Sequence, residues 1–255
     1  MNKLMIKKTL KWSMAASFFY VIFLLATLPM ATVLSYFPKS EKHSYEGVTG
    51  TFWQGGLQTI SVPEGRLSNV QWQVRPLSLL MGQLVEDIKF GAKDELSGKG
   101  HFGSGLFGYY AEDLQLSMPA TLIINKLPLP IPLTATGDLE LNLVHGSGGT
   151  PLCASFDGEL KWLDGVVETP AGKLKLQQLK AVLSCQDGMV NALITEQSEQ
   201  MSLELSLQLK GKQQYKLTGW IKAEAGMPKM IANSLNFIGE KDPQGRYRVN
   251  LIKDF

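Results

Sequence analysis

A regular alternation of apolar and polar residues is the feature of this chain that most constrains its fold. In residues 201–210, MSLELSLQLK, every second residue is apolar. Successive side chains of a β-strand point to opposite faces, so a period of two predicts strands with one apolar and one polar face. The same alternation recurs in several other segments: 70–75, 139–143, 173–176 and 215–217.

Turn signals separate these segments and favour antiparallel neighbours. Asp187-Gly188 lies between two apolar runs and is typical of a two-residue hairpin turn. Helical patterns are scarce: residues 76–84 and 228–238 each begin at a proline, which suits the first turn of a helix. We expect a mainly β fold, in which a single N-terminal transmembrane helix precedes an elongated antiparallel β-sheet domain with two short helices.

The N-terminal region carries the signature of a membrane anchor. No charged residue occurs from Trp12 to Pro38, and Lys3, Lys7, Lys8 and Lys11 precede this run. About 20 apolar residues cross a bilayer, and lysines on one flank stay in the cytoplasm. We predict a cytoplasmic N-terminus at 1–11, a transmembrane anchor at 12–34 and a periplasmic β-rich domain at 39–255. A cleaved signal peptide is the alternative, although a small-x-small cleavage site is poorly represented.

Charge excludes one class of partner. The chain has 25 Lys+Arg and 23 Asp+Glu; without the four N-terminal lysines, residues 39–255 hold 21 basic and 23 acidic residues, a net charge of −2. This balance lacks the basic patch that phosphate-backbone binding requires, so we expect no nucleic acid partner. The similar alternation on both sides of the Gly-rich segment 146–151 favours one domain, with a subdivision at that segment as the alternative.

The two cysteines, Cys153 and Cys185, both fall in the predicted periplasmic part. In an oxidising compartment two cysteines favour a disulfide over a metal site or a nucleophile. We predict a structural Cys153–Cys185 bridge. Two buried free thiols are the alternative.

No pattern of catalytic or ligand-binding residues stands out. The three histidines, His43, His101 and His145, lack the spacing of zinc ligands. The glycines of 103–108 match a dinucleotide fingerprint in letters only, because an alternating strand pattern follows where a helix is required. We therefore expect no catalytic, cofactor or metal site, and no enzymatic activity.

Two blocks behind the predicted anchor are distinctive in their order. Residues 48–56 read VTGTFWQGG, and residues 67–84 read LSNVQWQVRPLSLLMGQL. In this order the blocks resemble the N protein of the bacterial type II secretion system (general secretion pathway protein N), and the resemblance extends over nearly the whole chain. The residues that carry it, with a structural or interaction role, are Gly50, Trp53, Gly55, Trp72, Pro76 and Gly82.

The resemblance implies a non-catalytic inner-membrane component that supports export of folded proteins across the outer membrane. Its partners would be other secretion components in the inner membrane and periplasm, reached through periplasmic contacts. A second hypothesis is an AsmA-like periplasmic protein with a lipid-binding groove, because the leucine-rich face could form an open trough. From the sequence we favour a closed core for that face.

Overall fold

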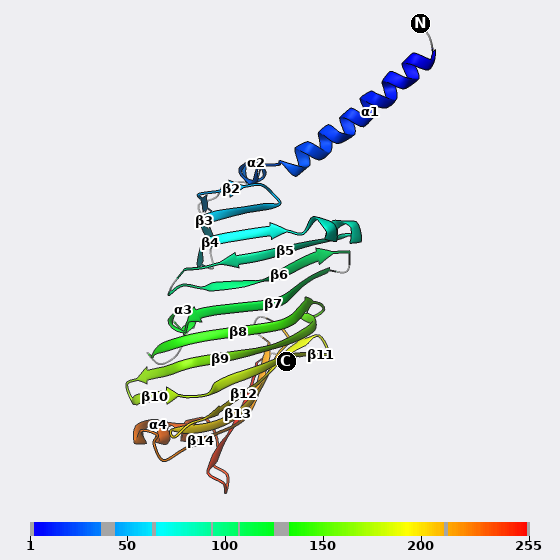
Figure 1. Cartoon of the computed structure of the whole chain (residues 1–255). Coiled ribbons are helices and arrows are strands. Elements are labelled where there is room, and N and C mark those ends of the chain that lie inside the picture. The colour runs from blue at the N-terminus through cyan, green and yellow to red at the C-terminus, as the bar shows by residue number, and fades with distance from the viewer. Residues whose placement is uncertain are drawn as a thin grey trace.

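The computed structural model describes residues 3–36, 44–62, 65–92, 94–106, 108–124, 133–211 and 214–253. A long helix, α1 (Lys3–Ala26), and a short one, α2 (Met30–Ser35), lead into a single antiparallel sheet that forms almost the whole molecule (Figure 1). The predicted mainly β class, with an elongated antiparallel sheet, is confirmed.

The sheet follows chain order. Its path is β1-β3-β4-β5-β6-β7-β8-β9-β11-β12-β13-β14-β15, with β2 paired to β3 and β10 to β9. The strands are β1 (Ser44–Glu46), β2 (Thr49–Gly50), β3 (Gln54–Val62), β4 (Gly65–Val74), β5 (Gln83–Phe90), β6 (Ser97–Gly105), β7 (Gly108–Pro119), β8 (Thr134–Gly148), β9 (Cys153–Thr169), β10 (Gly172–Leu176), β11 (Leu179–Gln186), β12 (Met189–Gln197), β13 (Met201–Leu209), β14 (Tyr215–Ala223) and β15 (Arg246–Lys253).

Several tight hairpins contribute to this order, whereas the β4–β5, β7–β8 and β14–β15 connections contain short helices. At the β11–β12 turn, Asp187 and Gly188 both have positive φ, 53° and 75°, as the predicted two-residue turn requires. The Gly-rich segment 146–151 contains the end of β8 and most of its turn into β9, and these strands pair from Thr134–Glu168 to Gly148–Cys153. One sheet therefore runs through that segment.

The alternation seen in the sequence becomes two different faces. Cross-strand partners share a face, so Leu205 lies beside Ile194, and Leu207 beside Ala192, on one side. We call this side the apolar face. Two rows cross ten strands of it, from β5 to β15. Row one is Phe90, Gly98, Leu116, Leu141, Leu160, Ala181, Ile194, Leu205, Gly219 and Val249. Row two is Ile88, Gly100, Leu114, Leu143, Gly158, Leu183, Ala192, Leu207, Leu217 and Leu251.

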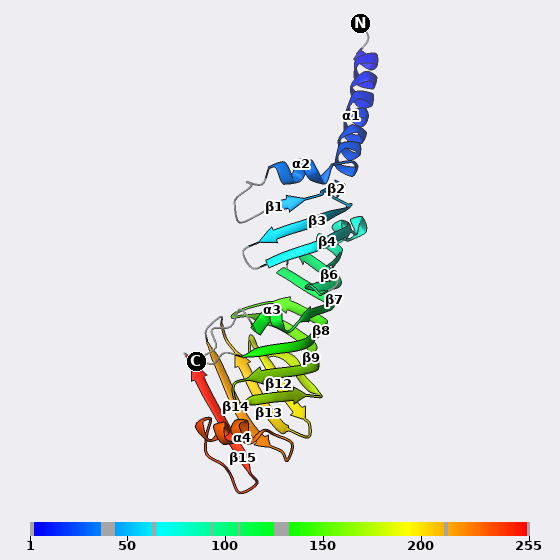
Figure 2. The ribbon, with the colours of Figure 1, turned by 90° about the vertical axis from the view of Figure 1, so that its left-hand side faces the viewer.

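The short helices α2 and α4 (Lys229–Ser234) pack against the apolar face. In Figure 2, α2 lies above β1 and β3, α3 (Thr121–Ile124) lies beside β8, and α4 lies at the lower left near β15. At one end Met30 and Leu34 of α2 pack against Leu57, Trp72 and Val74. At the other end α4 and η2 (Leu235–Phe237) close a core with these buried residues: Leu176, Met201, Leu203, Met227, Leu235 and Tyr247.

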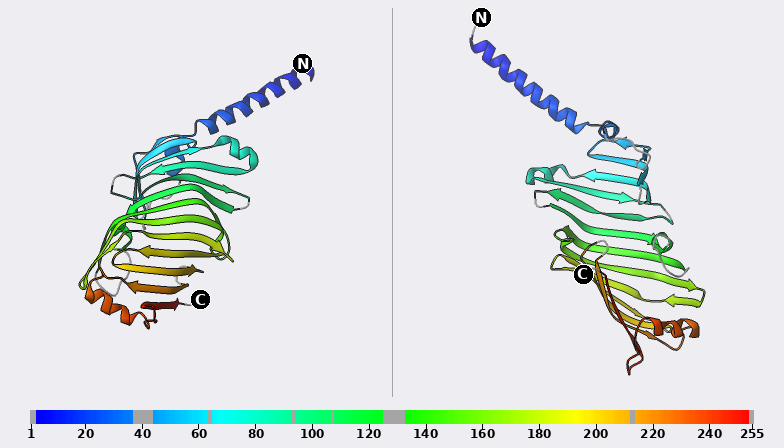
Figure 3. Two further views of the ribbon diagram at one scale, coloured as in Figure 1. Left: turned by 60° about the horizontal axis from the view of Figure 1, so that its bottom comes forward. Right: turned by 180° about the vertical axis from the view of Figure 1, so that it is seen from behind.

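Between these two small cores the sheet is a single layer, as the further views in Figure 3 show. The molecule exposes 17,382 Å², whereas a compact monomer of 28.1 kDa exposes about 11,100 Å². No large side chain among the described residues is less than 2% exposed. Some residues of this face between the two cores are also buried, among them Leu114, Leu143, Ala181 and Ala192. The closed core that the sequence favoured for the leucine face is completed by helices only at its ends.

The N-terminal segment differs from the expected single helix over 12–34. The chain is helical from Lys3, breaks at Thr27–Pro29 and resumes in α2. Pro29 has no amide hydrogen for helical bonding, and its φ of −68° and ψ of 135° are extended. Across the described ranges, none of the helices is long and apolar enough to cross a membrane.

The other predicted helices are shorter than expected. Residues 76–84 form only the 3-10 helix η1 (Pro76–Met81), because Gly82 adopts a left-handed conformation with φ of 71°. Residues 228–238 become α4 and η2, and α3 was not predicted. The expected start of the β domain at residue 39 and most of the proline-rich segment 127–133 lie outside the described residues.

Candidate functional site at the helix–sheet junction

The residues singled out from the sequence gather near the start of the sheet. They form two groups: Gly50, Trp53, Gly55 and Trp72 meet where the helices join β2–β4, whereas Pro76 and Gly82 bound η1. The β-strand register brings the first group together across 22 positions of sequence, since Gly50 pairs with Gly55 and Gly55 pairs with Trp72.

Trp53 fastens the end of α1 to the sheet. Its indole Nε1 donates to the Leu25 carbonyl over 2.6 Å, and the amide of Phe52 donates to the Leu28 carbonyl over 2.9 Å. Carbonyls in the last turn of a helix have no partner within that helix, so outside donors satisfy them. The Phe52 and Trp53 rings meet edge to face, 5.3 Å apart. We call these contacts the junction clamp.

Trp72 occupies the space that Gly55 leaves. Trp72 is 9% exposed, and its Nε1 donates to the Phe52 carbonyl over 3.1 Å. A Cβ on Gly55 would overlap both the Trp72 ring and the Thr49 carbonyl. Gly50 has a φ of 84°, which allows the tight β2–β3 turn. The glycines at 50 and 55 therefore permit a tight turn and close packing against Trp72.

The helix η1 presents apolar side chains to solvent. Leu77, Leu80 and Met81 are 76%, 85% and 83% exposed, and Leu106 in the adjacent β6–β7 turn is 90% exposed. Gly82 at the end of η1 lies against Gly105, whose strand leads into that turn. We call the four exposed residues Leu77, Leu80, Met81 and Leu106 the apolar knob. Two bonds through Ser78 hold η1 in place: its Oγ donates to the Arg75 carbonyl and accepts from the Val85 amide.

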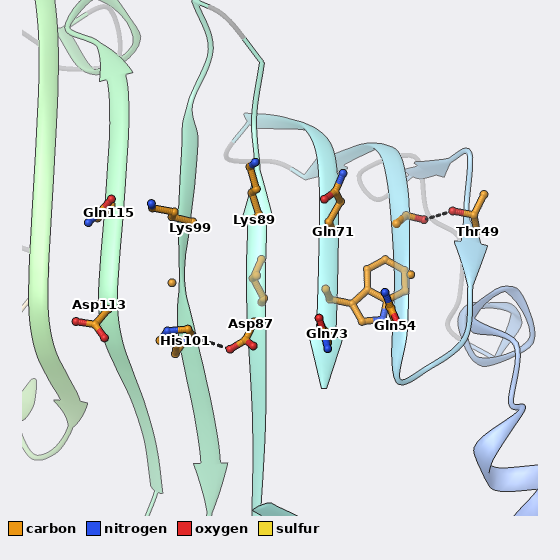
Figure 4. Close-up of a pocket in the computed structure, with 15 residues that line it drawn as sticks. Thr49, Gln54, Gln71, Gln73, Asp87, Lys89, Lys99, His101, Asp113 and Gln115 are labelled. Atoms are coloured by element: carbon orange, nitrogen blue, oxygen red, sulfur yellow. Dashed lines mark hydrogen bonds and ion pairs between the residues drawn. The ribbon is translucent and has the colours of Figure 1, made fainter. Parts of the chain in front are cut away.

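The opposite, polar face of β3–β7 forms a broad depression of about 920 Å³ (Figure 4). Its polar lining includes four glutamines and charged groups of both signs, drawn from five neighbouring strands: Gln54, Gln71, Gln73, Asp87, Lys89, Lys99, His101, Asp113 and Gln115. Gly55 and Trp72 also border it, so the depression adjoins the junction clamp.

Asp87 is the centre of an ion-pair cluster at the edge of this depression. Its Oδ1 lies 2.7 Å from Arg75 Nη2 and 2.5 Å from His101 Nδ1. Partial burial by itself would raise the pKa of Asp87, but hydrogen bonds from Arg75 and His101 outweigh burial and lower it. On the polar face, cross-strand pairing extends this cluster into a row of ionisable residues, Asp87–His101–Glu112–His145–Asp157. We call it the polar-face row.

A second depression lies on the apolar face, with a volume of about 450 Å³. Phe102, Leu143, Phe156 and Val190 contribute apolar lining. Glu86 stands at this site between Val74 and Phe102, and burial raises the pKa of its carboxyl.

The disulfide predicted from the sequence is present. Cys153 at the start of β9 is bonded to Cys185 near the end of β11, with Cα atoms 6.2 Å apart. The bridge closes the region in which the β10 hairpin projects from β9. Its role is to tie neighbouring strands together.

The described residues hold no candidate metal centre. No three His, Cys, Asp or Glu side chains there are arranged to hold a metal ion. His101 and His145 lie in the polar-face row, and His43 is outside the described residues. The arrangement suits binding: a polar depression, an exposed apolar knob and an apolar face.

Sequence reasoning did not single out Arg75, Asp87 or the exposure of η1. His101 and Asp87 are 14 positions apart, and only the β5–β6 register makes them neighbours. Each of the two residues occupies a polar position in the alternation of its own strand. That position indicates the polar face for both Asp87 and His101 once the strands are paired.

The chain is similar over most of its length to one family. The family model described as "Type II secretion system (T2SS), protein N" matches residues 42–250. Type II secretion system protein N of Vibrio cholerae is 36% identical over 88% of this chain and 89% of the relative. The protein of that name from Aeromonas hydrophila is 32% identical over 89% and 91%, and that from Pectobacterium carotovorum is 28% identical over 91% of each chain. No solved structure matches.

Proposed function

Because the chain belongs to the type II secretion system protein N family, we propose that it is a non-catalytic inner-membrane component of that system. In this role it supports export of folded proteins across the outer membrane through periplasmic contacts with other components. The family match supplies the pathway. A binding role suits the described residues better than a chemical one, because their polar groups are paired with one another at the surface.

The proposed topology is single-pass, with the N-terminus cytoplasmic and the sheet domain periplasmic. Its support is the charge-free run 12–38 behind four lysines. The helix α1 also projects from the sheet with exposed apolar side chains, Trp12, Phe18, Phe19 and Phe23 among them (Figure 1). Apolar surface of this extent is typical of a membrane or partner contact. The disulfide fits an oxidising compartment.

The observation that carries the contact role is the apolar knob. Leu77, Leu80 and Met81 leave the sheet in a short, rigid turn and bury little of their surface. Exposed apolar patches of this kind are typical of protein or membrane contacts. In Figure 1 η1 lies at the edge of the sheet toward which α1 also points, so a partner there would sit near the proposed membrane. We therefore assign the knob to contact with another secretion component.

Photo-crosslinking in cells tests this assignment. A photoreactive phenylalanine analogue at Leu80 should capture a secretion component. The same analogue at Phe237, which is 93% exposed at the far end of the sheet, should not. Leu80→Asp should reduce secretion of a type II substrate, with Phe237→Asp as the matched control.

The wild-type protein level and an intact Cys153–Cys185 bridge on a non-reducing gel would show that Leu80→Asp folds. Both substitutions are at the surface and should change stability by at most about 0.5 kcal/mol. Normal secretion by the folded Leu80→Asp variant, or equal capture at both positions, would contradict the assignment.

A further inference from the structure

The apolar face is continuous far beyond the two small cores. Rows one and two each cross ten strands, and neither row contains a side chain that can donate or accept a hydrogen bond. Neighbouring strands lie about 4.8 Å apart, so nine intervals give a path of about 43 Å along the sheet. A hydrocarbon chain in one bilayer leaflet occupies about half of a 30 Å core, or about 15 Å.

The middle of this path has no second layer among the described residues. The helix α2 covers the first end, and α4 with η2 covers the last. The helix α3 borders β7 and β8. Between them Leu116, Leu141 and Leu160 of row one stay partly exposed, whereas Leu114 and Leu143 of row two are buried. We call this stretch of the two rows, between the helices at the two ends, the apolar trough.

The chemistry of the trough limits what can fill it. The backbone groups of its strands are already paired within the sheet, and its side chains offer only hydrocarbon. Protein interfaces carry about one hydrogen bond per 100–200 Å² and are only about 56–58% non-polar. A protein partner would thus leave its polar groups unsatisfied here, whereas an acyl chain has none to satisfy. The 450 Å³ depression adjoins the trough at Leu143, is lined by Phe102 and Phe156 as well as by the polar Glu86, and lies within the size range of small-molecule sites, about 300–1,000 Å³.

The position of the trough indicates the source of the chains. Its first end meets Met30 and Leu34 of α2, which directly follows the apolar helix α1. The apolar helix α1 is therefore connected through α2 to the first end of the apolar face. We propose that the apolar trough holds the acyl chains of membrane phospholipid, which enter at the α2 end. Hydrocarbon binding goes beyond the proposed function, whereas the choice of phospholipid as its source rests on the anchor in that proposal.

Photo-crosslinking from matched positions tests the proposal in the full chain. Leu141 pairs with Leu160 on the apolar face, and the adjacent pair Glu140–Lys161 faces the opposite side of the same strands. A photoreactive phenylalanine analogue would replace each of the four residues in turn, in cells grown with radioactive phosphate. After ultraviolet irradiation, denaturing purification and gel separation, we expect label at positions 141 and 160 and its loss at 140 and 161.

The possible outcomes separate the alternatives. The Cys153–Cys185 bridge on a non-reducing gel reports which variants have folded. Folded variants at 141 and 160 without label, or label equal on both faces, would overturn the proposal. A fatty acid adduct without phosphorus in the mass spectrum would overturn the phospholipid source, and a captured protein would overturn hydrocarbon binding. Failure here leaves the Leu80 experiment unaffected, so the two proposals can fail separately.

Discussion

Two neighbouring glycines, Gly55 and Gly56, provide a direct test of how the junction is packed. A Cβ on Gly55 would overlap the Trp72 ring and the Thr49 carbonyl. A Cβ on Gly56 would have its nearest neighbour, the Val70 carbonyl oxygen, at 3.4 Å, an ordinary contact. Neither residue has a positive φ, so alanine is compatible with the backbone at both. The two substitutions add the same methyl group and differ only in the space available to it.

The expected effects have opposite signs. Overpacking against Trp72 should make Gly55→Ala destabilising by about 1–3 kcal/mol. Gly56→Ala should be neutral or stabilising by up to about 1 kcal/mol, because alanine restricts the unfolded chain. In a protein of this size 1 kcal/mol shifts the melting temperature by about 2–4 °C.

Thermal unfolding of the detergent-purified full chain, followed by tryptophan fluorescence, would measure both shifts. Gly55→Ala should therefore melt about 2–12 °C below the wild type. If both variants melted with the wild type, or both fell equally, the close packing of Trp72 on Gly55 would be refuted.

Two further predictions concern the disulfide and the ion-pair cluster. Replacing Cys153 and Cys185 together by alanine should cost about 3.7 kcal/mol in the chain-entropy model for a separation of 32 residues, measured by urea unfolding; an unchanged midpoint would contradict it. The pKa of Asp87 is lowered in the folded chain, so its ionised form stabilises the fold above the unfolded pKa of about 3.9, and this contribution disappears as pH falls through the lower folded value. Because the Arg75–Asp87 pair is exposed, Asp87→Asn should reduce the free energy of unfolding by less than about 1 kcal/mol at pH 7. In acid unfolding, the variant should lose less stability than the wild type below pH 4. An acid profile identical to that of the wild type would show that the cluster contributes nothing.

The sequence predicted the strands well because their signal is local. The alternation in 201–210 became β13 (Met201–Leu209), and Asp187-Gly188 became the β11–β12 turn. It could not predict the Arg75–Asp87–His101 cluster, since that depends on which register two strands adopt. Nor could it decide between a closed core and an open trough. Alternation assigns a side chain to a face, but whether a second layer covers that face depends on elements elsewhere in the chain.

A single-layer sheet distributes its functions differently from a compact domain. Almost every strand of this sheet pairs with strands close to it in sequence, the exceptions to strict order being the β1–β3 and β9–β11 pairs. The stability of each region therefore comes mainly from adjacent strands, as in repeat proteins. Leu80 of the knob lies in η1 after β4, and Leu141 lies in β8, four strands further along the path, or about 19 Å at 4.8 Å per strand. Sites this far apart without shared contacts act independently on stability. The knob and the trough can therefore serve two binding roles in one small chain, one toward a protein and one toward hydrocarbon.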